Sequence, residues 1–160
     1  MGKYQRFEDL PVWQESNRLY QRVLDVLEEP NAPFSATFRN QLERAALCVS
    51  NCVADSFEGY APNEVRGLLI TARGAAAEVQ SMVAIILDRP KVARLKEPLQ
   101  QVRASAESCF RQLGGWKHAL ENPGQNRRPA TNEESGPARS GTPAPPRNAA
   151  SARDAWRRPA

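Results

Sequence analysis

The fold of this chain is decided by residues 38–78, which read FRNQLERAALCVSNCVADSFEGYAPNEVRGLLITARGAAAE. Two helical patterns meet there at a break over residues 59–62, Gly-Tyr-Ala-Pro. Apolar residues recur every three or four positions on both sides of the break, as in a helix that presses one seam against its neighbours. The seams are Leu42, Ala45, Val49 and Cys52, then Val65, Leu69, Ala72, Ala76, Val79, Val83 and Ile86. The stretch therefore predicts two antiparallel helices of a bundle.

One further helix is predicted on each side of this hairpin. The first follows Asp9, interpreted as its N-cap, and ends near residues 29–30. The last runs from about Glu97 to Leu120, after a short turn over residues 91–96. Their seams are Val12, Ser16, Leu19, Val23 and Val26, and Leu99, Val102, Ala106, Cys109, Leu113, Trp116 and Leu120. Since no strand-like alternation is present, the sequence predicts an all-α, up-down-up-down four-helix bundle over residues 1–122.

Residues 123–160 have a different composition, rich in Pro, Arg, Ala, Ser and Gly and without apolar periodicity. Little apolar surface is available there to offset the entropy of ordering, so we predict a disordered C-terminal tail. The charge is divided in the same way. Residues 1–122 hold fifteen basic and fifteen acidic residues, whereas residues 123–160 hold seven arginines and three acids. The tail therefore carries the whole net charge of +4.

Three cysteines and the lack of a signal sequence indicate a reduced compartment. Cys48, Cys52 and Cys109 cannot all pair, and each lies in an apolar helical stretch. The N-terminal residues MGKYQRFEDLPVW contain no apolar run, and the strongly apolar run over residues 82–87 is too short to span a bilayer. We expect a cytoplasmic protein with no membrane association.

The last predicted helix is the basic one, and three of its cations fall on the side away from the seam. These are Lys96, Arg103 and Arg111, a candidate phosphate-contacting row for nucleic acid. Glu107 lies one turn from both arginines and partly neutralises them, so a merely solvated face is the alternative.

The tail adds arginines and one aromatic residue. The candidate nucleic-acid-binding residues there are Arg127, Arg128, Arg153, Trp156, Arg157 and Arg158. Arginines displace counterions and an aromatic side chain stacks on a base, a combination that suits RNA or single-stranded nucleic acid. A linear motif that docks on another protein would look the same, and so would a tail without a dedicated partner.

A third set, Asp55, Glu58 and Arg73, flanks the central break. We interpret it as an oligomer or ligand contact, or as an ion pair that fixes the corner between the two helices. Gly114 and Gly115, within the last helix, suggest that another backbone comes close there, as in a subunit contact. Apolar residues beyond a single seam also favour a homo-oligomer, namely Trp13, Tyr20, Phe57, Tyr60 and Phe110.

Convergent catalytic groups are scarce, so we predict no enzymatic activity and no cofactor. His118 is the only histidine, and it is interpreted as a surface residue near a helix C-terminus. Cys48 and Cys52 could supply two metal ligands, but a second pair is missing, so buried thiols are the preferred interpretation and no metal site is expected. A bound metal or cofactor in the purified protein would reverse this view.

A resemblance to a known family covers roughly residues 7–120. The chain resembles the 23S ribosomal RNA intervening-sequence proteins, four-helix bundles whose fold is shared by the accessory variability determinant (Avd) proteins of diversity-generating retroelements. The matching runs are Phe7-Glu8-Asp9-Leu10, Val12-Trp13-Gln14, Gln41-Leu42, Arg44-Ala45-Ala46, Val53-Ala54-Asp55, Glu64, Ala72-Arg73-Gly74 and Ala77-Glu78. The chain departs from the family pattern at Cys52 in place of Asn, Asp55-Ser56 in place of Glu-Gly, and Gly59 in place of Arg.

The resemblance implies a bundle that assembles as a ring of five. It also implies two functions. The leading hypothesis is a non-enzymatic scaffold that binds RNA and a partner protein, an Avd-like accessory to a retroelement reverse transcriptase. The alternative is an intervening-sequence-type protein that acts as a protein-interaction module without nucleic-acid binding.

Overall fold

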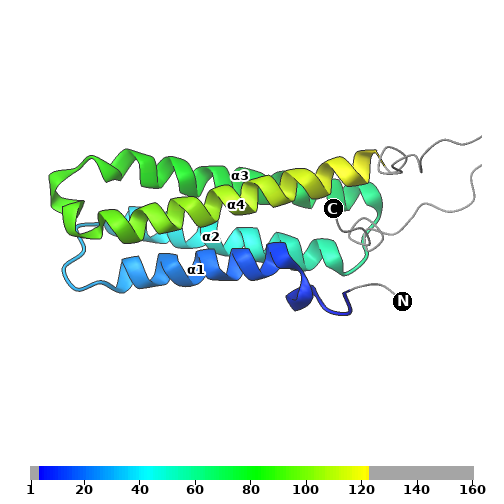
Figure 1. Cartoon of the computed structure of the whole chain (residues 1–160), viewed down its shortest axis with the longest axis horizontal. Coiled ribbons are helices and arrows are strands. Elements are labelled where there is room, and N and C mark those ends of the chain that lie inside the picture. The colour runs from blue at the N-terminus through cyan, green and yellow to red at the C-terminus, as the bar shows by residue number, and fades with distance from the viewer. Residues whose placement is uncertain (1–3, 123–160) are drawn as a thin grey trace, which may run out of the picture.

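Four long helices lie side by side in an antiparallel bundle (Figure 1). The structure is a computed structural model, and it describes residues 4–122. Its elements are a 3-10 turn η1 (Phe7–Asp9), α1 (Pro11–Glu28), α2 (Ala36–Phe57), α3 (Pro62–Leu87), a 3-10 segment η2 (Pro90–Leu95) and α4 (Lys96–Glu121). Each long helix packs on two others, because α1 contacts both α2 and α4 and α3 lies between α2 and α4. No strand occurs within residues 4–122, so the predicted fold class is confirmed for this part of the chain.

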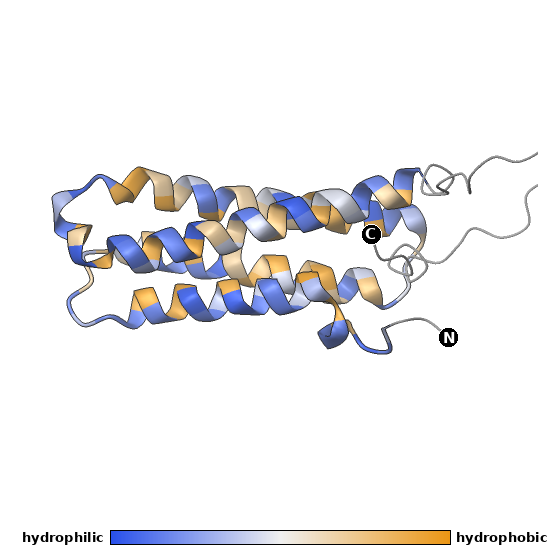
Figure 2. Cartoon of the chain, viewed as in Figure 1, coloured by the Kyte–Doolittle hydropathy of each residue, from blue (hydrophilic) through white to orange (hydrophobic). Residues whose placement is uncertain are grey.

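The core is built from the four predicted seams. Every predicted seam residue is buried except Leu120 in the last turn of α4, which is half-buried. Leu19, Leu42, Leu69 and Leu99 have no exposed surface, one from each helix. Along the ribbons of α1 and α4 in Figure 2, hydrophilic and hydrophobic residues alternate, as expected of helices with one buried face. Burial of these seams, at about 25 cal/mol per Å² of apolar surface, is what holds the four helices together.

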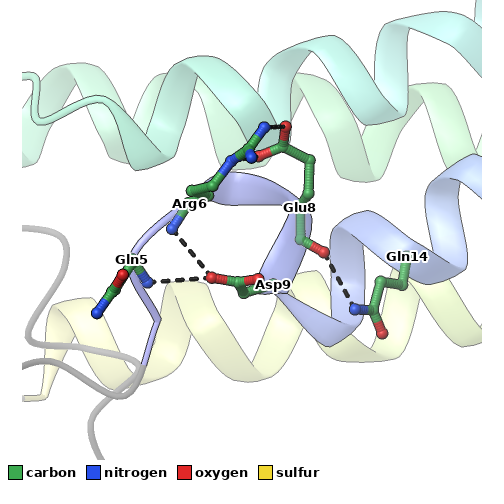
Figure 3. A network of polar contacts seen from close by, with 5 residues as sticks. All are labelled: Gln5, Arg6, Glu8, Asp9 and Gln14. Carbon is green, nitrogen blue, oxygen red and sulfur yellow. Dashed lines mark hydrogen bonds and ion pairs between the residues drawn. The ribbon is translucent and has the colours of Figure 1, made fainter.

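The entry into α1 differs from the prediction. Asp9 is not its N-cap; that position belongs to Leu10, whose side chain is fully buried. The Asp9 carboxylate instead accepts hydrogen bonds from the backbone N–H groups of Gln5 (3.2 Å) and Arg6 (3.1 Å), which closes η1 (Figure 3). Gln14 then donates to the Glu8 carbonyl (3.0 Å), joining this turn to α1. An aspartate can cap either a helix or the turn that precedes it. Here Asp9 caps the preceding turn, and burial of the Leu10 side chain favours this arrangement.

The hairpin between α2 and α3 follows the predicted signals. Gly59 adopts φ +100°, the left-handed conformation that a glycine accepts without a steric penalty. Pro62 is the first residue of α3, and the Glu64 carboxylate accepts from the backbone N–H of Ala61 (3.0 Å), which satisfies a donor at the helix start. The turn is thus built by residues whose local preferences agree with the fold.

The opposite end of the bundle is tied by arginines. Arg39 donates to the backbone carbonyls of Leu27, Ala32 (3.1 Å) and Phe34 (3.4 Å), and its guanidinium lies 5.7 Å from the Phe34 ring centre. Arg94 in η2 donates to the Pro30 carbonyl, which links this turn to the α3–α4 connection. We call this region, residues 29–35 with η2, the arginine-tied end.

Four serines are buried in an otherwise apolar interior, and each has a partner. Ser16, Ser50 and Ser56 donate to backbone carbonyls one turn earlier, at 2.8, 2.9 and 2.6 Å. Ser105 accepts from Arg22, so a side-chain bond joins α1 to α4 across the bundle. These polar groups therefore cost little, and one of them connects the first and last helices.

Candidate nucleic-acid and partner interfaces

The predicted basic row lies along the outer side of α4. Lys96, Arg103 and Arg111 are all exposed, and they extend over about 22 Å of helix at 1.5 Å per residue. Arg111 forms an ion pair with Glu107 at 2.9 Å, as the sequence suggested. Within the described residues, Lys96 and Arg103 form no ion pair. The row therefore offers two uncompensated cations and one whose charge is shared.

The remaining nucleic-acid candidates belong to the tail. Residues Arg127, Arg128, Arg153, Trp156, Arg157 and Arg158 lie outside the described residues. Their predicted role in nucleic-acid binding stays a prediction.

The predicted corner set is not brought together as an ion pair. Asp55 and Glu58 are exposed at the end of α2, and neither forms an ion pair with Arg73 within residues 4–122. Asp55 lies against residues 64–71 of α3, whereas Arg73 comes later on α3 and points to α4. In an antiparallel hairpin the residues that face each other lie at similar distances from the turn, and Arg73 lies much farther from it than Asp55 and Glu58 do. A role of these residues in oligomer contacts remains a prediction.

Arg73 has a different environment, which the sequence did not indicate. Its guanidinium stacks on the Phe110 ring at 4.2 Å from the ring centre, and a Cβ added at Gly114 would lie 3.6 Å from it. Within the described residues the close neighbour of Gly114 is thus this side chain, and nothing lies within 4 Å of a Cβ at Gly115. A subunit contact at these two glycines stays a prediction. The Arg73 Nε is buried, and within residues 4–122 it has neither a hydrogen-bond partner nor a carboxylate in an ion pair, so its positive charge is held at the α3–α4 surface.

Two adjoining hollows run along the outer side of α2 and α3, and Thr71 lines both. The first has a volume of about 440 Å³ and is lined by Gln41, Arg44, Ala45, Cys48, Thr71, Gly74, Ala75 and Glu78. The second has about 430 Å³ and is lined by Asp55, Tyr60, Glu64, Gly67, Leu68 and Thr71. The only sequence signal for them is the spacing of Gly67, Thr71 and Gly74 by four and three residues on the side opposite the α3 seam.

The aromatic residues outside the seams divide into two groups. Phe57 is buried, and Trp13, Tyr20 and Phe110 are half-buried against the core. Tyr60 remains 50% exposed at the α2–α3 turn, beside the second hollow. Of the five side chains that favoured an oligomer, the bundle thus covers Phe57 fully, Trp13, Tyr20 and Phe110 in part, and Tyr60 least.

The cysteines are unpaired thiols. The sulfur atoms of Cys48 and Cys52 lie 3.8 Å apart on α2, and no disulfide is formed by Cys48, Cys52 or Cys109. Burial raises the pKa of the Cys52 thiol to about 12, with Cys48 and Asp55 adding to the effect, and burial raises the pKa of Cys109 to about 12. Neither buried thiol forms thiolate near neutral pH, so neither is an activated nucleophile.

No group of three potential metal ligands among His, Cys, Asp and Glu occurs in the described part of the chain. His118 is exposed on the last turn of α4, where its backbone carbonyl accepts from the Asn122 N–H at 3.0 Å.

Within residues 4–122, α3 is the one helix long and apolar enough to cross a bilayer by length and composition, with a mean hydropathy of 1.3 over an 18-residue window. Of that 18-residue window 39% is buried in the bundle, and the exposed side chains of Ile70 and Ile85 add to its hydropathy.

The order and packing of these helices define the class of protein: an all-α, up-down-up-down four-helix bundle with basic groups on α4 and a hollowed α2–α3 surface. The family model of the 23S rRNA-intervening sequence protein matches residues 8–115. The chain belongs to this family. No curated protein and no solved structure shows a significant match to it.

Proposed function

We propose that the protein is a non-catalytic, homo-oligomeric scaffold that binds RNA and a partner protein, in the manner of an Avd accessory to a retroelement reverse transcriptase. The observation that carries the RNA part is the uncompensated positive charge on α4. Lys96 and Arg103 face solvent without a carboxylate partner in the described chain, although residues 1–122 are neutral as a whole. Cations that are not consumed by internal pairs are the ones that can release counterions from phosphates.

Arg73 supports the same surface. Stacking on Phe110 holds its guanidinium in place, and a guanidinium stacked in this way keeps edge donors that suit a phosphate or carboxylate. The α3–α4 side of the bundle thus offers a fixed cation beside the α4 row. The seven tail arginines would add contacts, and assembly of several copies would multiply them through effective concentration.

The RNA part is tested by titrating a labelled structured RNA with the full-length protein at several salt concentrations. We expect the affinity to fall steeply with salt. Replacing Arg103 by Ala should weaken binding by roughly threefold to tenfold and lower the salt slope by about 0.7 to 0.9, the value for one phosphate contact. The matched control is Arg44→Ala, since Arg44 is also exposed and unpaired in the described chain but lies on α2. Equal effects of the two variants, or binding that is insensitive to salt, would refute the α4 interface.

The partner part is tested by co-purification with a candidate reverse transcriptase, with and without nuclease. Release of the polymerase by nuclease would mean that RNA bridges the two proteins. Retention would mean direct contact. Recovery of neither would reject the accessory role.

A second function is favoured by the hollows between α2 and α3. Their lining combines small residues, one half-buried thiol and the exposed Tyr60 ring, a surface that suits a protein partner better than a nucleic acid. In this alternative the protein is an interaction module without nucleic-acid binding. It predicts no RNA binding in the titration and a partner that nuclease treatment leaves attached.

A further inference from the structure

The second hollow on the α2–α3 side lies where the described chain leaves the bundle. Arg66, in the second turn of α3, forms an ion pair with Glu121, in the last turn of α4, at 2.7 Å. The end of α4 and the α2–α3 turn therefore share one end of the bundle, as Figure 1 shows. Gly67 and Leu68 of the hollow directly follow Arg66 in the chain. Whatever follows residue 122 starts within a few turns of this hollow.

The surroundings of the hollow are acidic. Asp55 and Glu64 line it, and Glu58 lies on the adjoining turn; all three are exposed. Within residues 4–122 none of the three forms an ion pair with a lysine or arginine. Half of the Tyr60 surface faces solvent beside them, and Leu68, which also lines the hollow, is half-buried. We call this region, residues 55–71, the acidic end. It presents an aromatic ring and an aliphatic side chain among carboxylates that lack a cation.

One segment of the chain outside the described residues has the complementary chemistry. Residues 153–158 read Arg-Asp-Ala-Trp-Arg-Arg, with a net charge of +2 and the only tryptophan in residues 123–160. Thirty residues, 123–152, separate this segment from the end of α4. Fully extended they would reach about 100 Å, so chain length does not prevent a return to the hollow. Attachment to the same chain raises the effective concentration of the segment at a nearby surface to the millimolar range, of order 1 mM.

We propose that residues 153–158 dock in the hollow of the acidic end of their own chain. Trp156 packs on Tyr60 and Leu68, and the flanking arginines face Asp55, Glu58 and Glu64. Tryptophan and arginine are enriched among the few residues that carry most of the binding energy at interfaces, and a tryptophan buries a large apolar area. This docking does not require the RNA binding proposed above. The docking would nevertheless affect RNA binding, because arginines held at the acidic end are not available to RNA.

The test uses the full-length protein with a nitroxide spin label at position 151, introduced by Ser151→Cys in a Cys48→Ala background. Cys52 and Cys109 stay in place because both are buried. In the absence of RNA, we expect paramagnetic broadening of the backbone amide signals of Tyr60, Leu68 and Thr71. The amides of Ala32 and Val92, at the arginine-tied end, should remain sharp. Broadening spread evenly over both ends, or absent from both, would overturn the proposal.

Two variants in the labelled protein separate a specific site from general attraction of charge. Trp156→Ala should reduce the broadening at Leu68 by at least about threefold, as loss of an anchor side chain does. Arg139→Ala removes one tail cation outside the segment and should leave the pattern unchanged. Equal effects of the two variants would contradict docking through Trp156.

A mixed sample identifies the source of the segment. Two samples are mixed at equal concentration. One protein carries the spin label and natural-abundance nitrogen, and the other carries nitrogen-15 and no spin label. Docking within one chain predicts no broadening in this mixture. Broadening of Tyr60 and Leu68 in the mixture would show that a second copy donates the segment, and would overturn docking in the same chain.

Discussion

The two ends of the bundle solve the problem of helix termination in opposite ways. At the arginine-tied end, Arg39 and Arg94 donate to four backbone carbonyls, three in the α1–α2 turn and one, that of Leu27, in the last turn of α1. These positive side chains therefore hold the fold together. At the acidic end the turn is closed by Gly59 and by the Glu64 carboxylate, and Asp55 and Glu58 keep charges that no described cation neutralises. The charged side chains of one end bind backbone carbonyls of the same chain, whereas those of the other end are available to a partner.

This difference shows where binding is to be sought. A side chain that satisfies buried carbonyls cannot be diverted to a ligand without loss of stability. Charges that do no structural work can change partners freely. The following predictions test the contrast through the free energy of unfolding, beginning with the largest change.

Replacement of Arg39 by Ala should destabilise the protein by about 2 kcal/mol, because carbonyls of a half-buried turn lose their donors. Chemical unfolding of the full-length protein measures this. The control is Arg44→Ala, an exposed arginine on the same helix with no ion pair in the described chain, whose effect should stay within about 0.5 kcal/mol. Similar losses for the two variants would mean that the arginine-tied end is not held by Arg39.

Replacement of Gly59 by Ala should cost about 1 to 2 kcal/mol, since φ +100° is a strained conformation for a residue with a Cβ. The matched control is Gly67→Ala, inside α3, where a Cβ meets nothing from the described residues within 4 Å. That change should stabilise the protein by about 0.5 to 1 kcal/mol, because alanine favours a helix over glycine. Opposite signs in thermal unfolding would confirm that the two glycines have different roles.

Ser35→Ala tests the arginine-tied end from the start of α2. The Ser35 hydroxyl oxygen accepts from the Phe38 N–H at 3.2 Å, and loss of such a cap costs about 1 kcal/mol. Ser81→Ala, at an exposed position within α3, should be neutral or slightly stabilising. A neutral Ser35 variant would show that water replaces this cap.

The smallest effect concerns Glu121, next to the acidic end. Its pKa is lowered from 4.5, chiefly by the hydrogen bond from Lys117 (3.0 Å) and also by Arg66 (2.7 Å). The associated stability is therefore present above about pH 4.5 and is lost as the pH falls through the lower folded-state pKa. An NMR titration of the Glu121 carboxyl should show this shift, and Lys117→Ala should move the pKa back toward 4.5 by more than Arg66→Ala does. The reverse order would contradict the assignment.

Periodicity was sufficient to predict the four helices and their core. The α3 seam from Val65 to Ile86 keeps its spacing over the whole helix, and the glycine and proline signals at residues 59 and 62 are local, so neither depends on distant contacts. The one error at a helix start concerns Asp9. Its carboxylate could accept from N–H groups of α1 or of the preceding turn, and it binds those of the preceding turn. The short turn predicted over residues 91–96 corresponds to η2, and Pro98 is tolerated in the first turn of α4.

The polar sites could not be predicted in this way. A sequence shows that Arg39 and Arg73 are both helix arginines, but not that one reaches back to carbonyls twelve positions earlier and the other stacks on Phe110. Long side chains choose partners by three-dimensional proximity, which helix spacing alone does not specify. The α4 row was predictable because its members share one helix, and the contact between Arg73 and Gly114 was not, because it joins two.

The bond from Arg22 to Ser105 joins residues 83 positions apart, and it has a consequence for biosynthesis. On the ribosome α2 and α3 can pair as soon as they emerge, but the buried side of α1 has no second neighbour until α4 has been translated. A nascent chain that stops before residue 96 would therefore expose apolar surface of both α1 and α3, and would be a substrate for chaperones or proteases. Premature termination in this protein should remove the product and not release a shorter working form.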